Sequence, residues 1–105
     1  MIKVIEGYEL KKGADIQPLF LKLRSYAMTF PGFISVEHIS SVKGTSISAL
    51  LYNWERRENW EAWEISKLRQ QIIQAESEAL FVTKPRITIY EVIPTSAWTY
   101  TGFKS

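Results

Sequence analysis

The chain has 105 residues, of which 46% are hydrophobic and 23% charged, and this is the composition of one small globular domain. A net charge of +2 without any basic run argues against a nucleic-acid partner, and the absence of cysteine excludes disulfides, thiolate metal sites and cysteine nucleophiles. Because the chain holds one histidine, His38, and one aspartate, Asp15, we expect no metal site. The four Trp, five Tyr and five Phe residues need places in a core, an interface or a pocket.

The first residues do not have the form of a signal peptide, because Glu6 and Glu9 interrupt the apolar stretch. No segment approaches the roughly 20 apolar residues that are needed to span a membrane. We therefore expect a cytoplasmic protein without a membrane partner.

Alternation of apolar and polar side chains predicts a first strand over residues 2–10, followed by a turn at residues 11–13. Asp15 is placed to cap a helix, with Pro18 in its first turn, and Pro31-Gly32 ends that segment. The apolar residues of this helix repeat at helical spacing: Ile16, Leu19, Phe20, Leu23 and Ala27.

Two further strands are predicted over residues 33–42 and 46–54, and they form a hairpin. A long helix is predicted from Arg57 to about Ala79, and a fourth strand over residues 86–93. The order βαββαβ is the split βαβ arrangement. We therefore predict an α+β, ferredoxin-like fold with an antiparallel four-stranded sheet.

Both faces of the predicted sheet carry apolar side chains, whereas an antiparallel sheet with one wet face should alternate apolar and polar residues. The third strand has Ile47, Ala49 and Leu51 on one face and Leu50, Tyr52 and Trp54 on the other. Two helices can cover only one face, so we expect a homodimer in which a second copy covers the other.

An aromatic C-terminal tail, residues 94–105, follows the domain formed by residues 1–93. The tail carries Trp98, Tyr100 and Phe103. We expect these rings to pack on the neighbouring subunit or, alternatively, to fold back on their own domain.

The second predicted helix is not cleanly amphipathic. One apolar stripe runs along it: Ile65, Leu68, Ile72 and Ala75. Trp60 and Trp63 fall off the edge of this stripe, which predicts their contact with a second surface, either a pocket or the other subunit.

Four short motifs occur in an order and spacing that resemble a known family. They are residues 31–37 (PGFISVE), 52–55 (YNWE), 58–66 (ENWEAWEIS) and 90–92 (YEV), within a match that spans residues 1–93. In this way the chain resembles the antibiotic-biosynthesis-monooxygenase domains. The resemblance implies a dimeric α+β barrel in which the two sheets face each other, with a pocket between the sheet and the helices of each subunit. Branches of the family include cofactor-free monooxygenases of aromatic polyketides and haem-degrading monooxygenases.

The haem-degrading branch carries an Asn on strand one and a proximal His about ten residues after the helix-two Trp, and the resemblance places Glu6 and Ile73 at these positions. The commoner histidine, six residues after Trp63, is replaced by Arg69. We therefore expect no haem and no other cofactor. Haem binding through other ligands stays as a third hypothesis, which the Soret band of added hemin would test.

The polyketide branch implies an electron-rich phenol that becomes an anion and passes an electron to O₂, while the protein shields the radical pair from water. The side chains that would bind the ring are Trp63, Tyr8 and Tyr52. The groups that would generate or stabilise the anion, and so act with Trp63 as catalytic candidates, are Asn59, Arg69 and His38. The further candidates for substrate binding are Tyr26, Asn53 and Glu6.

Several of these residues also have a plain structural interpretation. Trp63 can equally pack in the core, and His38, whose ordinary titration range includes neutral pH, can be a hydrogen-bonded bystander. Arg69 either holds an anionic substrate or pairs with a nearby Glu at the surface. Glu6 either faces the pocket and acts as a base or lies at the rim of the sheet beside a Lys.

Two main hypotheses remain. The first is a dimeric, cofactor-independent monooxygenase that acts on a small aromatic or polyketide-like compound with O₂. The second is a non-catalytic dimeric small-molecule-binding or stress-response protein on the same scaffold. An enzyme requires an enclosed apolar pocket between Trp63 and the sheet that at least two polar side chains reach, whereas the second hypothesis predicts a filled core there.

Overall fold

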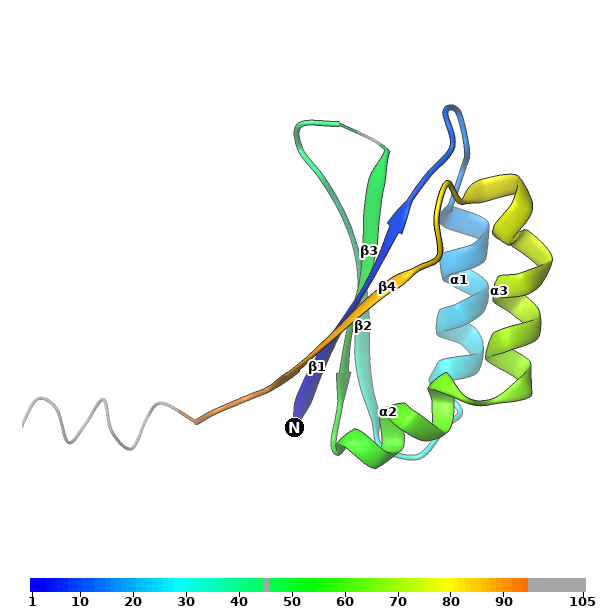
Figure 1. Cartoon of the computed structure of the whole chain (residues 1–105). Helices are drawn as coiled ribbons and strands as arrows, with labels where there is room; N and C mark the ends of the chain where they lie inside the picture. The colour runs from blue at the N-terminus through cyan, green and yellow to red at the C-terminus, as the bar shows by residue number, and fades with distance from the viewer. Residues whose placement is uncertain (45, 95–105) are drawn as a thin grey trace, which may run out of the picture.

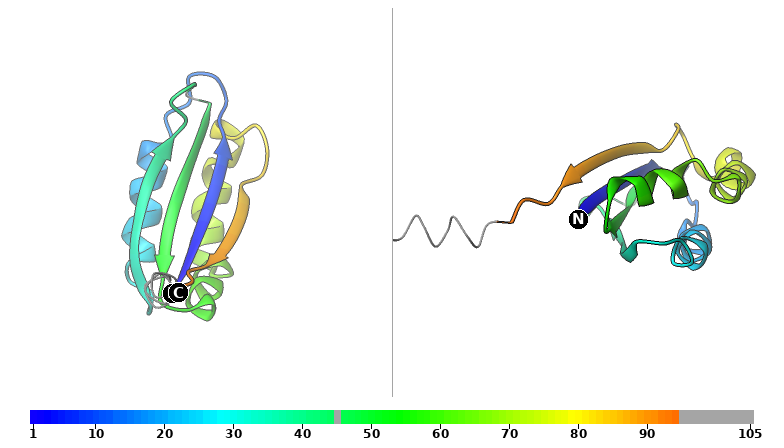
Figure 2. Two further views of the ribbon diagram at one scale, coloured as in Figure 1. Left: turned by 90° about the vertical axis from the view of Figure 1, so that its left-hand side faces the viewer. Right: turned by 90° about the horizontal axis from the view of Figure 1, so that it is seen from below.

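A computed structural model describes residues 1–44 and 46–94, and in this part of the chain three helices cover one face of a four-stranded sheet (Figures 1 and 2). The elements in chain order are β1 (Ile2–Glu9), α1 (Gln17–Ala27), β2 (Phe33–Ser40), β3 (Ile47–Trp54), α2 (Arg57–Glu64), α3 (Lys67–Leu80) and β4 (Arg86–Glu91). The strand order is β2-β3-β1-β4, and each neighbouring pair is antiparallel. The predicted α+β, ferredoxin-like fold is confirmed.

The pairing register decides which side chains face the helices. Val4 of β1 lies opposite Tyr52 of β3, and both are fully buried under the helices. Because side chains alternate along a strand, Leu50 and Trp54 share this inner face, while Ala49 and the other odd-numbered residues of β3 lie on the outer face. The two faces predicted for this strand are therefore confirmed.

The prediction of one continuous helix from Arg57 to about Ala79 is wrong, because the helix breaks at Ser66. The Ser66 backbone is extended, and its hydroxyl accepts a hydrogen bond from the backbone N–H of Arg69 at 3.2 Å, so that Ser66 caps a new helix, α3. The same hydroxyl donates to the Trp63 carbonyl at 2.7 Å and so closes the end of α2.

This break changes the face that α2 buries. Trp60 and Trp63 are fully buried, whereas Ile65 is 70% exposed. The predicted stripe that joined Ile65 to Leu68 and Ile72 is therefore wrong at its first member. Leu68 and Ile72 belong to the buried side of α3, which runs in another direction from α2 (Figure 1).

Smaller differences concern the ends of elements. Asp15 accepts a hydrogen bond from the backbone N–H of Gln17 at 3.1 Å, but the residue at the N-cap of α1 is Ile16. The second strand ends at Ser40, two residues before the predicted Val42. The expectations for the aromatic rings of the tail concern residues outside the described part of the chain.

The outer face of the sheet has no helix over it (Figure 2). Its apolar members come from three strands: Ile5, Ile39, Ile47, Ala49 and Leu51. Among the helices of the described residues, none is long and apolar enough to cross a membrane. The cytoplasmic location stays a prediction.

Candidate functional site

The space between Trp63 and the sheet is filled by the rings of the protein itself. The ring centres of Tyr52 and Trp60 are 5.4 Å apart, and those of Trp54 and Trp60 are 6.4 Å apart. Trp63 packs edge-on against Phe30 at 5.0 Å. Because Tyr52, Trp54, Trp60 and Trp63 are all fully buried and the first three pack against one another, this end of the molecule is a packed aromatic core rather than a pocket.

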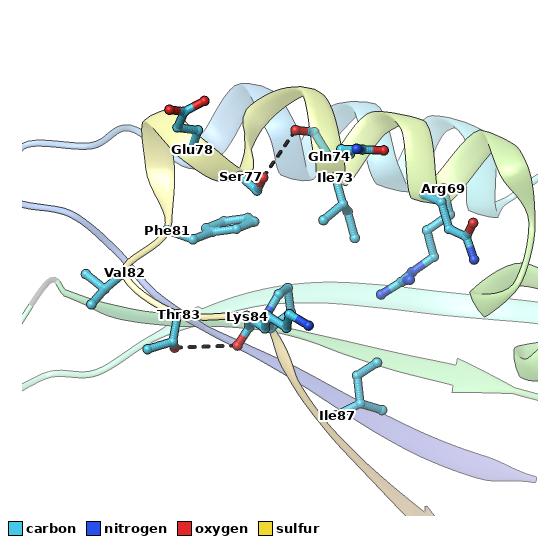
Figure 3. Close-up of a pocket in the computed structure, with 12 residues that line it drawn as sticks. Arg69, Ile73, Gln74, Ser77, Glu78, Phe81, Val82, Thr83, Lys84 and Ile87 are labelled. Atoms are coloured by element: carbon cyan, nitrogen blue, oxygen red, sulfur yellow. Dashed lines mark hydrogen bonds between the residues drawn. The ribbon is translucent and has the colours of Figure 1, made fainter.

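A groove lies farther along the helix layer, between α3 and the start of β4 (Figure 3). Its volume is about 530 Å³, which is within the range of small-molecule sites, about 300–1,000 Å³. Ile73 and Phe81 point into it from the helix side, and Ile87 faces them from β4. Gln70 and Ser77 supply polar groups along the α3 side of the groove. This α3–β4 groove is therefore mainly apolar inside, with hydrogen-bonding groups along one side.

A buried ion pair lies beside the α3–β4 groove. Arg69 lines the groove and points from α3 towards the sheet (Figure 3). Its guanidinium binds the carboxylate of Glu6 on β1, which is not among the residues that line the groove. The Glu6 side chain is 0% exposed and that of Arg69 is 9% exposed. In the register of the sheet Glu6 lies opposite Ile87, so the carboxylate stands beside the groove wall.

The surroundings of Arg69 keep it charged although it is buried. Burial lowers the pKa of Arg69 from 12.5 to about 10, which still leaves the guanidinium protonated at neutral pH. Its Nη1 also donates to the Glu64 carbonyl at 3.3 Å, and its guanidinium carbon lies 5.7 Å from the centre of the Trp60 ring.

The pair retains unused hydrogen-bonding capacity. The second carboxylate oxygen of Glu6, Oε1, is buried without a hydrogen-bond partner, and so is Nε of Arg69. Five polar atoms of the core rings Tyr8, Tyr52, Trp54, Trp60 and Trp63 are likewise buried without a hydrogen-bond partner, so unpaired atoms alone do not mark a site.

The structure separates most of the other candidate residues from this groove. Asn59 accepts a hydrogen bond from the backbone N–H of Arg56 at 3.1 Å and so caps α2. Tyr8 and Tyr52 lie in the core, where burial raises the pKa of each phenol above its ordinary value. For Tyr52 the nearby indole N–H of Trp63 offsets part of this rise in pKa, although the geometry between the two groups falls short of a full hydrogen bond.

The last three candidates lie elsewhere on the surface and on the sheet. Nδ1 of His38 is 2.8 Å from Oε1 of Gln17, and the His38 ring is exposed. Tyr26 is exposed on α1. Asn53 lies on the outer face, where it accepts a hydrogen bond from Lys3 at 2.9 Å and donates to Ser35 at 3.0 Å.

Of the nine predicted site residues, the structure thus brings together two, Glu6 and Arg69. The alternative for Arg69 is right in that it pairs with a Glu and wrong in that the pair is buried, and the alternative that places Glu6 at the rim of the sheet beside a Lys is wrong. Sequence reasoning missed Phe81 and Ile87 as groove residues, and it considered Ile73 only as a position that cannot bind haem iron. Within residues 1–44 and 46–94, no group of three or more His, Asp or Glu side chains could hold a metal ion.

Comparison with solved structures defines the class to which this architecture corresponds. This chain is similar to an antibiotic biosynthesis monooxygenase, with a TM-score of 0.75 and 16% sequence identity, over 90% of this chain and 100% of that one. It is similar to SnoaB, a cofactor-independent oxygenase from Streptomyces nogalater, with a TM-score of 0.75 and 11% identity, over 90% and 95% of the two chains. A conserved protein from Methanosarcina mazei Go1 matches with a TM-score of 0.77 and 19% identity, over 88% and 92%.

These identities are low, so the comparisons establish a shared fold. The chain has the fold of the antibiotic biosynthesis monooxygenases, and the fold implied by its four motifs is confirmed. Neither a protein-family model nor a curated protein sequence matches the chain.

Proposed function

We propose that this chain is a cofactor-independent oxygenase that takes a small aromatic compound into the α3–β4 groove and oxidises it with O₂. The observation that carries the proposal is the buried Glu6–Arg69 pair beside an apolar groove. The likeness in fold to a cofactor-independent oxygenase supports it.

The chemistry assigns a separate task to each partner of the pair. A phenol bound in the groove donates its proton to Oε1 of Glu6 after a shift of the Arg69 side chain, because this oxygen is buried and Glu6 does not line the groove. Once Glu6 is protonated, Arg69 has lost its counter-ion and holds the new phenolate instead. The electron-rich phenolate passes an electron to O₂, one oxygen atom enters the ring, and the other leaves as water when a quinone forms.

The apolar walls bind the ring of the compound, and the bound ring itself has to displace water from the groove. In the α3–β4 groove the ring is bound by Ile73, Phe81 and Ile87. These residues take the part first considered for Trp63 and the buried tyrosines, which lie in the packed core.

Oxygen consumption tests the proposal. The protein is mixed with 1-naphthol and 1,5-dihydroxynaphthalene in an oxygen electrode, and uptake above the buffer rate is expected. A double variant, Glu6→Leu with Arg69→Met, is expected to lose it. The matched control, Arg57→Met with Glu61→Leu, removes an exposed ion pair of 3.6 Å on α2 and is expected to retain it.

A second candidate function is a non-catalytic binding protein that uses the same groove. The filled space between Trp63 and the sheet favours it, because that hypothesis predicted such a core, whereas the monooxygenase hypothesis required an enclosed pocket there, and that expectation is wrong. Binding of the naphthols without oxygen uptake would replace the oxygenase by this second function.

We also propose that the chain forms a homodimer through the outer face of the sheet. Ile5, Ile39 and Leu51 are among the apolar side chains there, and no described element covers them. Leu51→Glu is expected to convert a dimer into a monomer in size-exclusion chromatography with light scattering. The control Leu21→Glu introduces the same charge on α1, where the leucine is already 51% exposed, and is expected to leave the dimer intact. A wild-type chain with the mass of a monomer would contradict the proposal.

A further inference from the structure

We infer that the α3–β4 groove binds a small aromatic carboxylate, with its ring between the apolar walls and its carboxylate on the ammonium group of Lys84. This inference rests on the groove that the proposed function uses, and it names the substrate class: an aromatic compound that carries a carboxylic acid.

The inside of the groove is suited to an aromatic ring. Ile73 and Phe81 on the helix side face Ile87 of β4 across the groove (Figure 3). A volume of about 530 Å³ is enough for a fused ring system. Val82, which is 54% exposed, extends the apolar lining towards the outside. Apolar walls bind many rings alike, so a polar group of the lining has to fix the orientation of the ligand.

Lys84 is the polar group that can do this. It belongs to the loop that joins α3 to β4, is exposed, and lines the groove on the side opposite Ile73 and Phe81 (Figure 3). Among the described residues its ammonium group forms neither an ion pair nor a hydrogen bond. Because an ammonium group has three donors, Lys84 can bind a carboxylate of the ligand without breaking a contact within the protein.

The carboxylates nearby leave this positive charge in place. Glu78 also lines the groove, but it points away from it in Figure 3, and no ion pair joins it to Lys84. Lys84 also lines a smaller neighbouring pocket of about 190 Å³, to which Arg86 and Glu9 bring one charge of each sign. The charge of Lys84 therefore remains uncompensated at the groove, and it attracts an anionic ligand group.

Two probes of the same shape isolate the contribution of charge. 2-Naphthoate and 2-naphthamide share the ring and a planar carbonyl group, and only the first is an anion. Each is titrated under argon and at low ionic strength into the wild-type protein, and the backbone amide signals of Ile73 and Ile87 are followed by NMR. 2-Naphthoate is expected to bind with a Kd about fivefold lower than that of 2-naphthamide, the difference that an ion pair of about 1 kcal/mol gives.

Three variants assign this preference to one side chain. Lys84→Met removes the charge and keeps an apolar stem, so the preference for 2-naphthoate is expected to vanish while the Kd of 2-naphthamide is unchanged. Lys84→Arg keeps the charge and is expected to keep the preference. The matched control, Lys12→Met, removes the same charge from the turn after β1, which does not line the groove, and is also expected to keep it.

Equal or tighter binding of 2-naphthamide to the wild type would overturn the inference. So would a preference that survives Lys84→Met, or the absence of any shift at the groove amides with both probes. Because no oxygen is present, the outcome is separate from oxidation. A preference for the carboxylate without oxygen uptake from the naphthols refutes only the oxygenase, whereas oxygen uptake without this preference refutes only the assignment of the carboxylate to Lys84.

Discussion

The buried ion pair is the feature whose removal has the largest expected effect on the stability of the protein. Glu6→Leu leaves Arg69 as an unpaired cation in the helix layer, and Arg69→Met leaves Glu6 as an unpaired anion beneath it. The Glu6 side chain is 0% exposed, whereas Arg69, at 9%, also lines the groove, so an unpaired Glu6 is expected to cost more than an unpaired Arg69. The double variant removes both charges and fills the space with apolar side chains of similar length.

The single and double variants are expected to differ in how much stability they lose. Breaking a buried pair by removal of one partner costs about 3–5 kcal/mol, and small domains have about 5–15 kcal/mol in total. Each single variant is therefore expected to lose about a fifth of its stability at the least, and nearly all of it if the domain is at the low end of the range. Replacement of both partners is often neutral or stabilising by about 1–4 kcal/mol. We expect the double variant to be as stable as the wild type or more stable, because the native pair includes two buried atoms without hydrogen-bond partners, Oε1 and Nε, and each of them lowers the stability of the wild type.

Urea unfolding followed by tryptophan fluorescence measures these free energies, since Trp54, Trp60 and Trp63 are buried in the core. Thermal unfolding gives a second readout, in which about 1 kcal/mol corresponds to roughly 4–8 °C for a domain of this size. The exposed pair Arg57–Glu61 is the control, and removal of both its partners should change stability by less than about 1 kcal/mol.

Two results would refute this reasoning. If each single variant stayed within about 1 kcal/mol of wild type, the two charges would have access to water or to other partners. If the double variant were destabilised by the sum of the two single changes, Glu6 and Arg69 would not be coupled, and the pair would not be the unit on which the site is built.

Two further predictions concern turns and high pH. Gly32→Ala is expected to lower the free energy of unfolding by at least about 1 kcal/mol more than Gly13→Ala. Both residues have positive φ, +82° and +77°, which costs alanine about 1–2 kcal/mol, but a Cβ on Gly32 would also lie 2.2 Å from Cγ of Asn59, whereas Gly13 faces open space. Equal urea midpoints for the two variants would contradict this. Stability is also expected to fall above pH 10, because burial raises the pKa of Tyr8 and Tyr52 in the folded state while the unfolded chain releases both phenolic protons from about pH 10. The contribution of the two tyrosines to stability is complete below pH 10 and is lost at about 1.4 kcal/mol per tyrosine for each pH unit above it. Burial lowers the pKa of Arg69 from 12.5 to about 10, so between these pH values its contribution to stability rises with pH and offsets the loss from about one tyrosine. Urea midpoints at pH 9, 10 and 11 should fall for wild type and not for the Tyr8→Phe, Tyr52→Phe double variant, and a parallel fall in both would assign the effect to other groups.

The strands and the two faces of the sheet could be predicted from the sequence because their signal is local. Side chains alternate with a period of two, so Val4, Tyr52 and Trp54 reveal a buried face without knowledge of their partners. The Pro31-Gly32 turn likewise depends on residues next to each other, and Gly32 adopts the positive φ that favours glycine.

The break between α2 and α3 is a case in which two local signals compete. Apolar residues continue at helical spacing through Ile65 to Leu68, and this periodicity predicts an uninterrupted helix. Ser66 carries the opposing signal, since serine is a preferred N-cap residue. The cap prevailed because it allows Trp60 and Trp63 to be buried on one helix and Ile72 on the next.

The site could be predicted only in part because it depends on a contact between distant residues. Glu6 and Arg69 are 63 positions apart, and each could be recognised separately as a charged residue in an apolar pattern. Their pairing, and the groove beside it, follow from the packing of α3 over β1 and β4, which no spacing in the sequence encodes. Phe81 and Ile87 became groove residues for the same reason.

The helix layer differs along its length in a way that points to the α3–β4 groove as the site. At the α2 end the chain fills the space with aromatic rings and leaves no groove between Trp63 and the sheet. Next to these rings, 5.7 Å from the centre of Trp60, the chain keeps Arg69 buried with Glu6, and Arg69 also lines the α3–β4 groove. A small domain selected for stability alone would place apolar residues there, since a buried ion pair seldom contributes more than a hydrophobic replacement. The retained charges therefore support the proposal that a ligand uses them, and the oxygen-uptake and binding measurements on the double variant test it.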